Sequence, residues 1–378
     1  MNKQQTQTHP HEPRKTGAQT LAGNLAKFIA PLAIVPLFLT GCAANENPSV
    51  LSESQSAGSA ALQTISGSGA SSQTAAQEAW RAGYSGTVNY DPVGSGAGRE
   101  AFSSGGAAFA GSDVPFKTED LKSSFANCEG GIVEVPAYIS PIAVAYNLEG
   151  VQLKLDAESI AKIFTGKITN WNDEALAELN KGTALPDLKI TAVHRSDKSG
   201  TTGNFTDYLA QAAPKEWSAG EVEEWPADLN GEAAEKTQGV RETLANTKGA
   251  IGYLDASQAG DLGVASVKSG DVFVTPTAEA SVKTVGGSSL ETGRGSADLA
   301  VDLNRTSVSG AYPLVMVSYL IGCEQYKDAA TGTAVKAYFE HVISESGQKA
   351  AAEHAGSAPL QADAALAEKV AKAVEAMK

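Results

Sequence analysis

Four short turns rich in glycine, serine and threonine are the segments of this sequence best suited to binding an anion. They lie at residues 66–72, 94–98, 111–113 and 199–203, between segments expected to be strands and helices. Such turns can direct backbone N–H groups and hydroxyls at a ligand from a helix N-terminus, where the helix dipole also favours negative charge. A single turn of this kind is most simply a helix N-cap. Four of them in one chain indicate an oxyanion site.

Two charged residues accompany these turns. Arg195 lies four residues before Ser199 and can bind a phosphate group bidentately, while Asp197 can hold the guanidinium in place by an ion pair. Asp113 suits a phosphate that still carries a proton, because a buried carboxylate can accept that hydrogen bond. Sulfate has no such proton and would leave Asp113 unpaired beside a like charge. Asp113 could also be a simple N-cap before Pro115, and that alternative stays open.

A serine hydrolase is the main catalytic alternative, since His194, Asp197 and Ser199 supply the three residue types of a triad. These residues lie within six positions, whereas triad partners normally come from separate elements. The sequence also has no Gly-x-Ser-x-Gly elbow, and the turn at 94–98 lacks the Gly-Lys-Ser/Thr of a phosphate-binding P-loop. We therefore expect a binding protein without catalytic activity.

Metals, cofactors and nucleic acids have little support in the sequence. The formal net charge of −14 argues against a nucleic-acid partner, although backbone dipoles can still favour a small anion inside a cleft. The histidines show no metal-ligand spacing. They are His9, His11, His194, His341 and His354. We expect neither a metal nor a cofactor.

The N-terminal segment has the pattern of a secretory signal. Basic residues precede the apolar run Phe28–Leu39, which is too short and too proline-rich to span a bilayer. Leu39-Thr40-Gly41-Cys42 then matches the lipobox of bacterial lipoproteins, in which the chain is cleaved before the cysteine and the thiol is lipidated. The alternative is an ordinary signal peptide that happens to contain a cysteine. Because the lipobox is bacterial, we discount the glycosylation sequon at Asn204–Thr206.

The remaining elements predict an α/β protein. Strand, Gly/Ser turn and helix alternate from about residue 61, which is typical of parallel sheets. Strands are expected at 61–65, 87–91, 106–110, 132–147, 188–194, 249–254 and 312–321. Helices are expected at 72–81, 99–104, 157–164, 173–180, 203–213, 276–283, 331–345, 347–354 and 362–377. Cys128 and Cys323 remain after Cys42 is lipidated, and they form either a disulfide or two buried thiols.

Several motifs together resemble the PstS-type phosphate-binding proteins, the substrate receptors of phosphate-specific ABC transporters. The resemblance runs from about residue 62 to the C-terminus without large gaps. The motifs that carry it are Ser66–Ser72, Val93–Gly96, Gly111–Asp113, Ile163–Trp171, Arg195–Thr202 and Gly249–Tyr253. One departure is that Ser71-Ser72 stands where many relatives have Thr-Phe, which would make the cleft more polar.

The resemblance implies a site and a fold. The phosphate shell would consist of Ser71, Ser72, Ser95, Asp113, Arg195, Ser199, Gly200 and Thr201, with Asp197 behind Arg195. The fold would have two α/β lobes, each a central, mostly parallel sheet flanked by helices, joined by two crossing hinge strands. The segments would be a signal peptide (1–41), a lipidated Cys42 with a flexible tether (42–60), lobe one (61–138 plus 313–378) and lobe two (139–312). Cys128–Cys323 would then be a disulfide within lobe one.

The implied function is that of a lipid-anchored receptor on the outer face of a bacterial cytoplasmic membrane, extracellular or periplasmic. It would bind inorganic phosphate as a monomer and deliver it to permease and ATPase subunits of an importer. Two related alternatives stay open. The same fold could bind another oxyanion such as sulfate or molybdate, or the protein could be a sensor or adhesin for which phosphate is a cue.

Overall fold

The structure, a computed structural model, describes residues 63–378. The expected signal peptide (1–41), Cys42 and the whole expected tether (42–60) therefore lie outside the described residues. No helix within residues 63–378 is long and apolar enough to cross a membrane.

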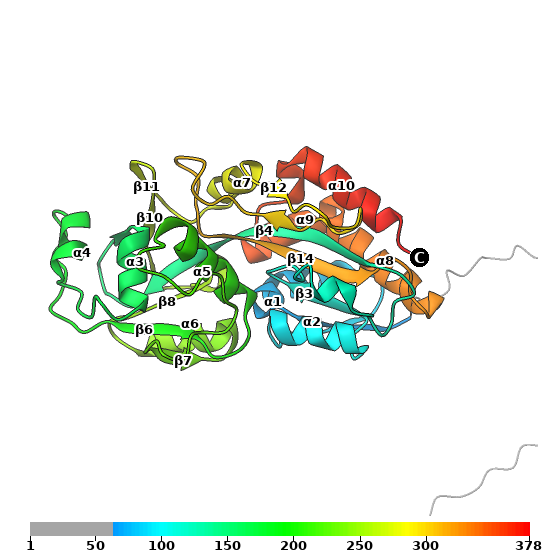
Figure 1. The fold of residues 1–378 in the computed structure, drawn as a ribbon, viewed down its shortest axis with the longest axis horizontal. Helices are drawn as coiled ribbons and strands as arrows, with labels where there is room; N and C mark the ends of the chain where they lie inside the picture. The colour runs from blue at the N-terminus through cyan, green and yellow to red at the C-terminus, as the bar shows by residue number, and fades with distance from the viewer. Residues whose placement is uncertain (1–62) are drawn as a thin grey trace, which may run out of the picture. The chain divides into compact units, whose positions relative to one another are not determined.

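A nine-stranded mixed sheet forms the centre of the fold (Figure 1). Its strands run in the order β2-β1-β3-β14-β4-β8-β6-β7, and β9 pairs with β4 beside this path. The strands are β1 (Ile65–Gly69), β2 (Val88–Asp91), β3 (Phe109–Ser112), β4 (Ile132–Tyr146), β6 (Thr191–Arg195), β7 (Glu232–Ala234), β8 (Ala250–Asp255), β9 (Gly263–Val264) and β14 (Val315–Cys323). Two small sheets contain β5 (Lys154–Leu155), β10 (Ser266–Ser269) and β11 (Val272–Val274), and β12 (Ser289–Leu290) and β13 (Val301–Asp302).

Strand direction divides the large sheet into three parts. The β2-β1-β3 part and the β8-β6-β7 part are parallel, as the strand–turn–helix pattern predicts. Between them lie β4 and β14, which pair antiparallel with each other and with β8 and β3. The two parallel parts thus belong to one continuous sheet, joined by the long strands β4 and β14.

A bulge in β4 explains how Pro136, one of the two internal prolines of the strand, stays in the sheet. Opposite β14 the register skips Ala137, because Ser318 pairs with Tyr138 whereas Tyr319 pairs with Pro136. A bulge is one of the places where a sheet tolerates proline. The Ala137 carbonyl accepts a hydrogen bond from Gln348 at 2.8 Å instead of a ladder bond.

Helices pack against both parallel parts. In Figure 1 the three C-terminal helices lie near β14 and β4, and α3 and α5 lie near β8 and β6. The helices are α1 (Thr74–Gly83), α2 (Ser95–Ser104), α3 (Ala157–Phe164), α4 (Glu174–Leu179), α5 (Gly200–Ala212), α6 (Lys236–Asn246), α7 (Ala278–Gly286), α8 (Ala329–Ile343), α9 (Glu345–Ala355) and α10 (Ala364–Glu375).

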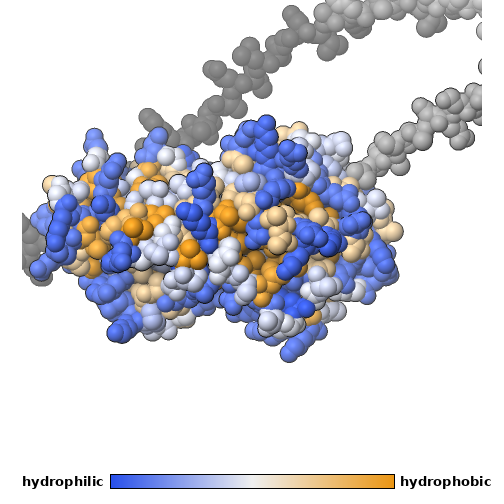
Figure 2. Space-filling view, turned by 90° about the horizontal axis from the view of Figure 1, so that it is seen from above, coloured by the Kyte–Doolittle hydropathy of each residue, from blue (hydrophilic) through white to orange (hydrophobic). Residues whose placement is uncertain are grey.

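The buried hydrophobic side chains form three clusters that divide along β4. Residues of β4 up to Ile139 pack with β1, β3 and the C-terminal helices. From Ile142 onward alternate residues of β4 face two other clusters, one with α3 and α5 and one with α6. Hydrophilic residues predominate on the face seen in Figure 2, with hydrophobic residues in patches between them.

Three main differences from the sequence prediction concern β1, α2, and the pair α6 and β7. The run 66–69, expected to be a turn after a strand, is itself most of β1. Gly67 permits this, because a Cβ there would lie 2.1 Å from the ring of Phe109 on the adjacent strand. Helix α2 begins at Ser95, four residues earlier than expected, so its first turn contains the Gly/Ser motif. The third difference is that α6 and β7 have no counterpart in the prediction.

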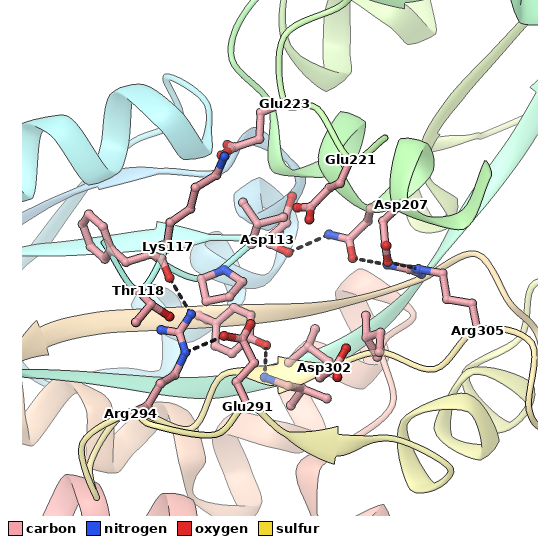
Figure 3. A pocket seen from close by; sticks show the side chains of 18 of the residues that line it. Asp113, Lys117, Thr118, Asp207, Glu221, Glu223, Glu291, Arg294, Asp302 and Arg305 are labelled. Carbon is pink, nitrogen blue, oxygen red and sulfur yellow. Dashed lines mark hydrogen bonds and ion pairs between the residues drawn. The ribbon is translucent and has the colours of Figure 1, made fainter. Parts of the chain in front are cut away.

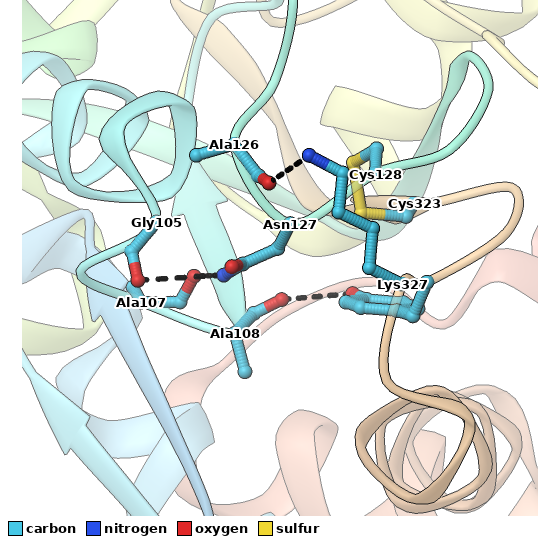
Figure 4. The surroundings of a disulfide bond; sticks show 9 residues. Gly105, Ala107, Ala108, Ala126, Asn127, Cys128, Cys323 and Lys327 are labelled. Carbon is cyan, nitrogen blue, oxygen red and sulfur yellow. Dashed lines mark hydrogen bonds between the residues drawn. A yellow bond between two sulfur atoms is a disulfide. The ribbon is translucent and has the colours of Figure 1, made fainter.

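Cys128 and Cys323 form a disulfide, as expected (Figure 4). Their Cα atoms are 5.2 Å apart, within the usual range for a disulfide. Cys323 ends β14, and Cys128 lies in the loop before β4. The bond therefore fixes that loop to the far end of a central strand.

Candidate anion-binding site

Asp113 is the centre of the candidate site. It follows β3 directly, is 2% exposed and caps no helix, so the N-cap alternative is wrong. Its Oδ2 accepts hydrogen bonds from Ser72 Oγ at 2.5 Å and Thr201 Oγ1 at 3.1 Å. Its Oδ1 accepts one from Ser318 Oγ at 2.7 Å. These three hydroxyls come from segments far apart in sequence, so Asp113 is where the anion-binding turns meet.

The protonation of Asp113 is set by two opposing effects. Burial raises the pKa of Asp113 above its usual value, because a carboxylate loses hydration in the interior. Hydrogen bonds from Ser72, Ser318 and Thr201 and the charge of Arg195 oppose this rise. The hydroxyl groups thus favour the ionised form of Asp113, which can accept a hydrogen bond from a protonated ligand.

The backbone of Asp113 is held from two sides. Its N–H donates to Ser95 Oγ at 3.2 Å, at the start of α2. Its carbonyl accepts from Asn204 Nδ2 at 2.6 Å, which lies in the second turn of α5. Asn204 is 4% exposed, and Arg305 donates to its Oδ1 at 2.7 Å. This buried arrangement is incompatible with a glycan on Asn204 in the folded protein.

Arg195 and Asp197 form a close ion pair beside this centre. Arg195 is 2% exposed, its Nε donates to Asp197 Oδ1 at 2.7 Å and its Nη2 contacts Asp197 Oδ2. Asp197 also accepts a hydrogen bond from the Lys236 N–H at 2.9 Å. Burial alone would raise the pKa of Asp197, but these hydrogen bonds and the charge of Arg195 lower it. Asp197 therefore stays ionised and fixes the guanidinium.

The N-terminus of α5 packs directly on Asp113. Ser199 is the N-cap of this helix, and its Oγ accepts a hydrogen bond from the Thr202 N–H at 3.2 Å. The N–H groups of the first helical residues have no acceptor within the helix and can face a ligand. A Cβ on Gly200 would lie 2.6 Å from Ser95 Oγ and 2.9 Å from Asp113 Cβ. Glycine at 200 therefore allows the helix dipole and N–H groups to approach the site.

Ser71 and Ser72 begin a short 3₁₀ turn after β1. The Ser72 hydroxyl donates a hydrogen bond to Asp113. The serine at this position, where many relatives have phenylalanine, therefore adds a polar contact to the site. Ser71 Oγ accepts from the Thr237 N–H at 3.1 Å, at the start of α6. Helix α6, which the sequence analysis missed, thus closes one side of the site.

Comparisons with known proteins identify the family of this chain. A model of the PBP superfamily domain matches residues 54–346. Phosphate-binding protein PstS 2 of Mycobacterium tuberculosis is 36% identical over 350 residues, covering 88% of this chain and 93% of the relative. Phosphate-binding protein PstS of Xylella fastidiosa is 31% identical over 337 residues, covering 83% of this chain and 89% of the relative. The chain belongs to the PstS-type phosphate-binding proteins of the PBP superfamily.

Solved structures share the fold of this PstS-type protein. A high-affinity periplasmic phosphate-binding protein, solved with bound phosphate, has a TM-score of 0.66 and 23% identity, covering 82% of this chain and 93% of that one. The phosphate-binding protein of Stenotrophomonas maltophilia has a TM-score of 0.64 and 22% identity over the same shares. The family is one of binding proteins, not enzymes.

The expected shell residues of this PstS-type protein are all buried and lie around Asp113. Direct contacts join Asp113 to Ser72, Ser95, Gly200 and Thr201. Ser71 and Ser199 occupy the neighbouring helix starts, and Arg195 reaches the site beside Asp197. Four further polar residues belong to the same cluster, and the sequence motifs do not predict them. They are Asn204, Thr237, Tyr253 and Ser318.

The triad alternative does not form in this PstS-type protein. His194 Nδ1 lies 2.9 Å from the Arg195 carbonyl, and its ring stacks on Trp225 with centroids 4.8 Å apart. Burial lowers the pKa of His194. Ser199 Oγ is the cap of α5, and Asp197 pairs with Arg195. The three side chains therefore have separate structural partners.

A cavity of about 300 Å³ lies beside Asp113 (Figure 3). Its charged lining is mixed, with Arg294 and Arg305 among carboxylates such as Glu221 and Glu291. Both arginines are paired, Arg305 with Asp207 at 2.6 Å and Arg294 with Glu291 at 2.7 Å. Asp113 and Asn204 of the candidate site both contribute to the lining of this cavity.

Proposed function

We propose that this protein is the receptor of a phosphate ABC importer, which binds inorganic phosphate at Asp113 and delivers it to the permease and ATPase subunits in the membrane. One observation carries the proposal: a fully buried carboxylate surrounded by hydroxyl donors, helix N-termini and an arginine. Its relatives at 31–36% identity are named as phosphate-binding proteins, which supports the same ligand here.

The proposed shell assigns each residue a role. Asp113 accepts a hydrogen bond from the protonated oxygen of HPO₄²⁻. Arg195 compensates the negative charge of the phosphate through Nη1, since its Nε and Nη2 contact Asp197. The other members donate hydroxyl or backbone N–H groups. They are Ser71, Ser72, Ser95, Ser199, Gly200 and Thr201. Ser72 and Thr201 hydroxyls, which donate to Asp113 in this structure, can rotate toward the ligand when it enters.

Selectivity against sulfate follows from the same carboxylate. Fully ionised sulfate cannot donate to Asp113, so two negative groups would face each other in a buried site. Phosphate replaces that repulsion by a charge-assisted hydrogen bond. The same reasoning disfavours molybdate, the other oxyanion considered for this fold.

We further propose that the fold acts as two lobes, 61–138 plus 313–378 and 139–312, hinged at β4 and β14. The division of hydrophobic clusters between Ile139 and Ile142 of β4 supports this boundary. On one face of β14, Met316 belongs to the cluster with α3 and α5 whereas Leu320 belongs to the cluster with the C-terminal helices, which supports a second crossing there. Closure of one lobe on the other would enclose the ligand.

Lipid anchoring at Cys42 places the receptor on the outer face of the cytoplasmic membrane in our proposal. Two or three acyl chains on one cysteine suffice for stable attachment. Expression of the full chain with labelled palmitate tests this, because Cys42→Ser should lose the label and move to the aqueous phase of a detergent partition. Equal labelling of both proteins would rule out Cys42 as the anchor.

Calorimetric titration of the full-length protein tests the ligand. We expect phosphate to bind with a Kd of about 1 μM or tighter, and sulfate and molybdate to bind far more weakly. Tighter binding of sulfate or molybdate would overturn the assignment. Co-purification with a permease then separates transport from a sensory or adhesive role.

A further inference from the structure

Arg99 and Glu223 form a buried ion pair outside the expected phosphate shell. Arg99 Nη2 lies 2.6 Å from Oε1 and 2.7 Å from Oε2 of Glu223. The two side chains are 8% and 9% exposed. Arg99 belongs to α2, in proposed lobe one, and Glu223 to the loop after α5, in proposed lobe two. The pair therefore joins the two lobes.

Arg99 is also tied to the residues that flank Asp113. Its Nη1 donates to Ser112 Oγ at 2.7 Å and to the Val114 carbonyl at 3.2 Å. Its guanidinium carbon lies 5.8 Å from the centre of the Phe116 ring. These contacts fix the guanidinium within its own lobe, so it faces Glu223 without having to be ordered by closure.

Glu223 is tied to the other side of the shell. Its backbone carbonyl accepts a hydrogen bond from the Ser199 N–H at 3.0 Å. Ser199 is the N-cap of α5, whose first residues Gly200 and Thr201 contact Asp113. The ion pair thus connects the segment that carries Asp113 to the segment that presents the α5 N-terminus.

The pair also lies where a path to the site would open. A second cavity, of about 890 Å³, is lined by Arg99 and Glu223, and the cavity beside Asp113 is lined by Glu223 as well (Figure 3). Phe116, Lys117 and Glu221 line both cavities. Separation of Arg99 from Glu223 would remove an ion pair beside the residues that the two cavities share.

From this geometry we infer that Arg99 and Glu223 are a latch that holds the lobes closed and sets the rate of phosphate release. The inference rests on the proposed function, because it assumes that phosphate is the ligand. In the open state Arg99 and Glu223 are apart and hydrated. If one of them is replaced by a neutral residue, closure buries the charge of the other without a partner. Loss of one partner therefore penalises the closed state specifically.

Release kinetics of the full-length protein test the latch. We expect Glu223→Gln to release radiolabelled phosphate at least about tenfold faster in a chase with unlabelled phosphate, while the association rate changes by less than about twofold. Glu224→Gln is the matched control, since it removes the same charge from the exposed neighbouring residue. Its release rate should equal that of the wild type.

A double-mutant cycle separates pairing from general damage. Arg99→Met should also accelerate phosphate release. The double variant, Arg99→Met with Glu223→Gln, should show a smaller acceleration than the product of the two single accelerations, because no buried charge is left unpaired. Arg99→Lys keeps the charge that faces Glu223 but loses the second nitrogen that binds Ser112 and Val114, and we expect a smaller acceleration. Thermal unfolding without phosphate should stay close to wild type in variants that fold.

The outcomes distinguish the latch from the function it serves. If wild type binds phosphate but Glu223→Gln and Arg99→Lys release it at the rate of Glu224→Gln, the latch is overturned and the phosphate receptor stands. Multiplicative single effects in the cycle would also overturn it. Wild-type protein that fails to bind phosphate would overturn the proposed function and the latch together.

Discussion

Ser318 Oγ donates a 2.7 Å hydrogen bond to Asp113 Oδ1, although the two residues lie 205 positions apart. Ser318 belongs to β14, which pairs antiparallel with β3, the strand that leads to Asp113. The same hydroxyl accepts from Gln73 Nε2 at 2.8 Å. A central strand of the sheet thus orients the carboxylate that we assign to the phosphate proton.

Removal of this hydroxyl should shift the pH dependence of binding. Burial raises the pKa of Asp113 and the Ser318 bond lowers it, so Ser318→Ala should raise that pKa further. The site needs an ionised Asp113, and binding therefore weakens as pH falls through this pKa. We expect Ser318→Ala to lose more affinity at about pH 5 than at about pH 8, by roughly tenfold, as measured by titration at both pH values. The exposed Ser124→Ala should follow wild type at both.

Asp255 should make the stability of the protein depend on pH. It is buried between Ser140 Oγ at 2.6 Å and the Ser257 N–H at 2.9 Å, and burial raises the pKa of Asp255 to about 6. At pH values between the ordinary pKa of an aspartate and about 6, Asp255 is ionised in the unfolded chain but still carries its proton in the folded protein. Folding is therefore penalised as pH rises through that window, by up to roughly 3 kcal/mol.

Urea unfolding of Asp255→Asn measures that penalty. The free energy of unfolding of the variant, relative to wild type, should increase from about pH 4 to about pH 7. Other carboxylates titrate equally in both proteins and cancel in the comparison. A constant difference across that range would contradict the assignment of the window to Asp255.

Removal of the Cys128–Cys323 disulfide should destabilise the protein without changing its ligand. The bond spans 195 residues of sequence, and a cross-link over such a long loop reduces the entropy of the unfolded chain. We expect the double change Cys128→Ser and Cys323→Ser to lower the free energy of unfolding by about 2–5 kcal/mol. Phosphate titration of the folded variant should give the wild-type Kd, and a large loss of affinity would show that the bond also shapes the site.

A methyl group on Gly98 should disturb the packing of α2 on β1. A Cβ there would lie 2.3 Å from the Gly69 Cα and 2.7 Å from the Ser68 carbonyl oxygen. Because both are backbone atoms, the helix must move, and we expect Gly98→Ala to cost about 1–3 kcal/mol. Gly286→Ala is the control, since a Cβ there meets nothing within 4 Å. Thermal unfolding should separate the two variants clearly.

The sequence predicted the parts of the site that depend on local composition. Gly/Ser turns at strand ends, Arg195 before Ser199 and Asp113 after a strand are visible in short windows, and each now lies in one buried cluster. Ser318 could not be identified in that way, because its role comes from the pairing of β14 with β3. A serine within an otherwise apolar run was the only signal.

The missed elements have a similar explanation. Helix α6 contains Gly239 and buries only Thr237, Val240 and Leu244, so its apolar periodicity is weak. Its position is set by contacts with the sheet and with Ser71. The strand β1 was misplaced because glycine usually marks a turn, whereas here it makes room for Phe109.

The role of Asp113 as the selector of protonated phosphate is tested most directly by calorimetric titration of wild type, Asp113→Asn and the exposed control Asp91→Asn with phosphate and with sulfate. We predict that wild type and Asp91→Asn strongly prefer phosphate, while Asp113→Asn loses about 1.5–3 kcal/mol of phosphate binding and most of its preference over sulfate. An Asp113→Asn variant that keeps the wild-type preference would contradict the account.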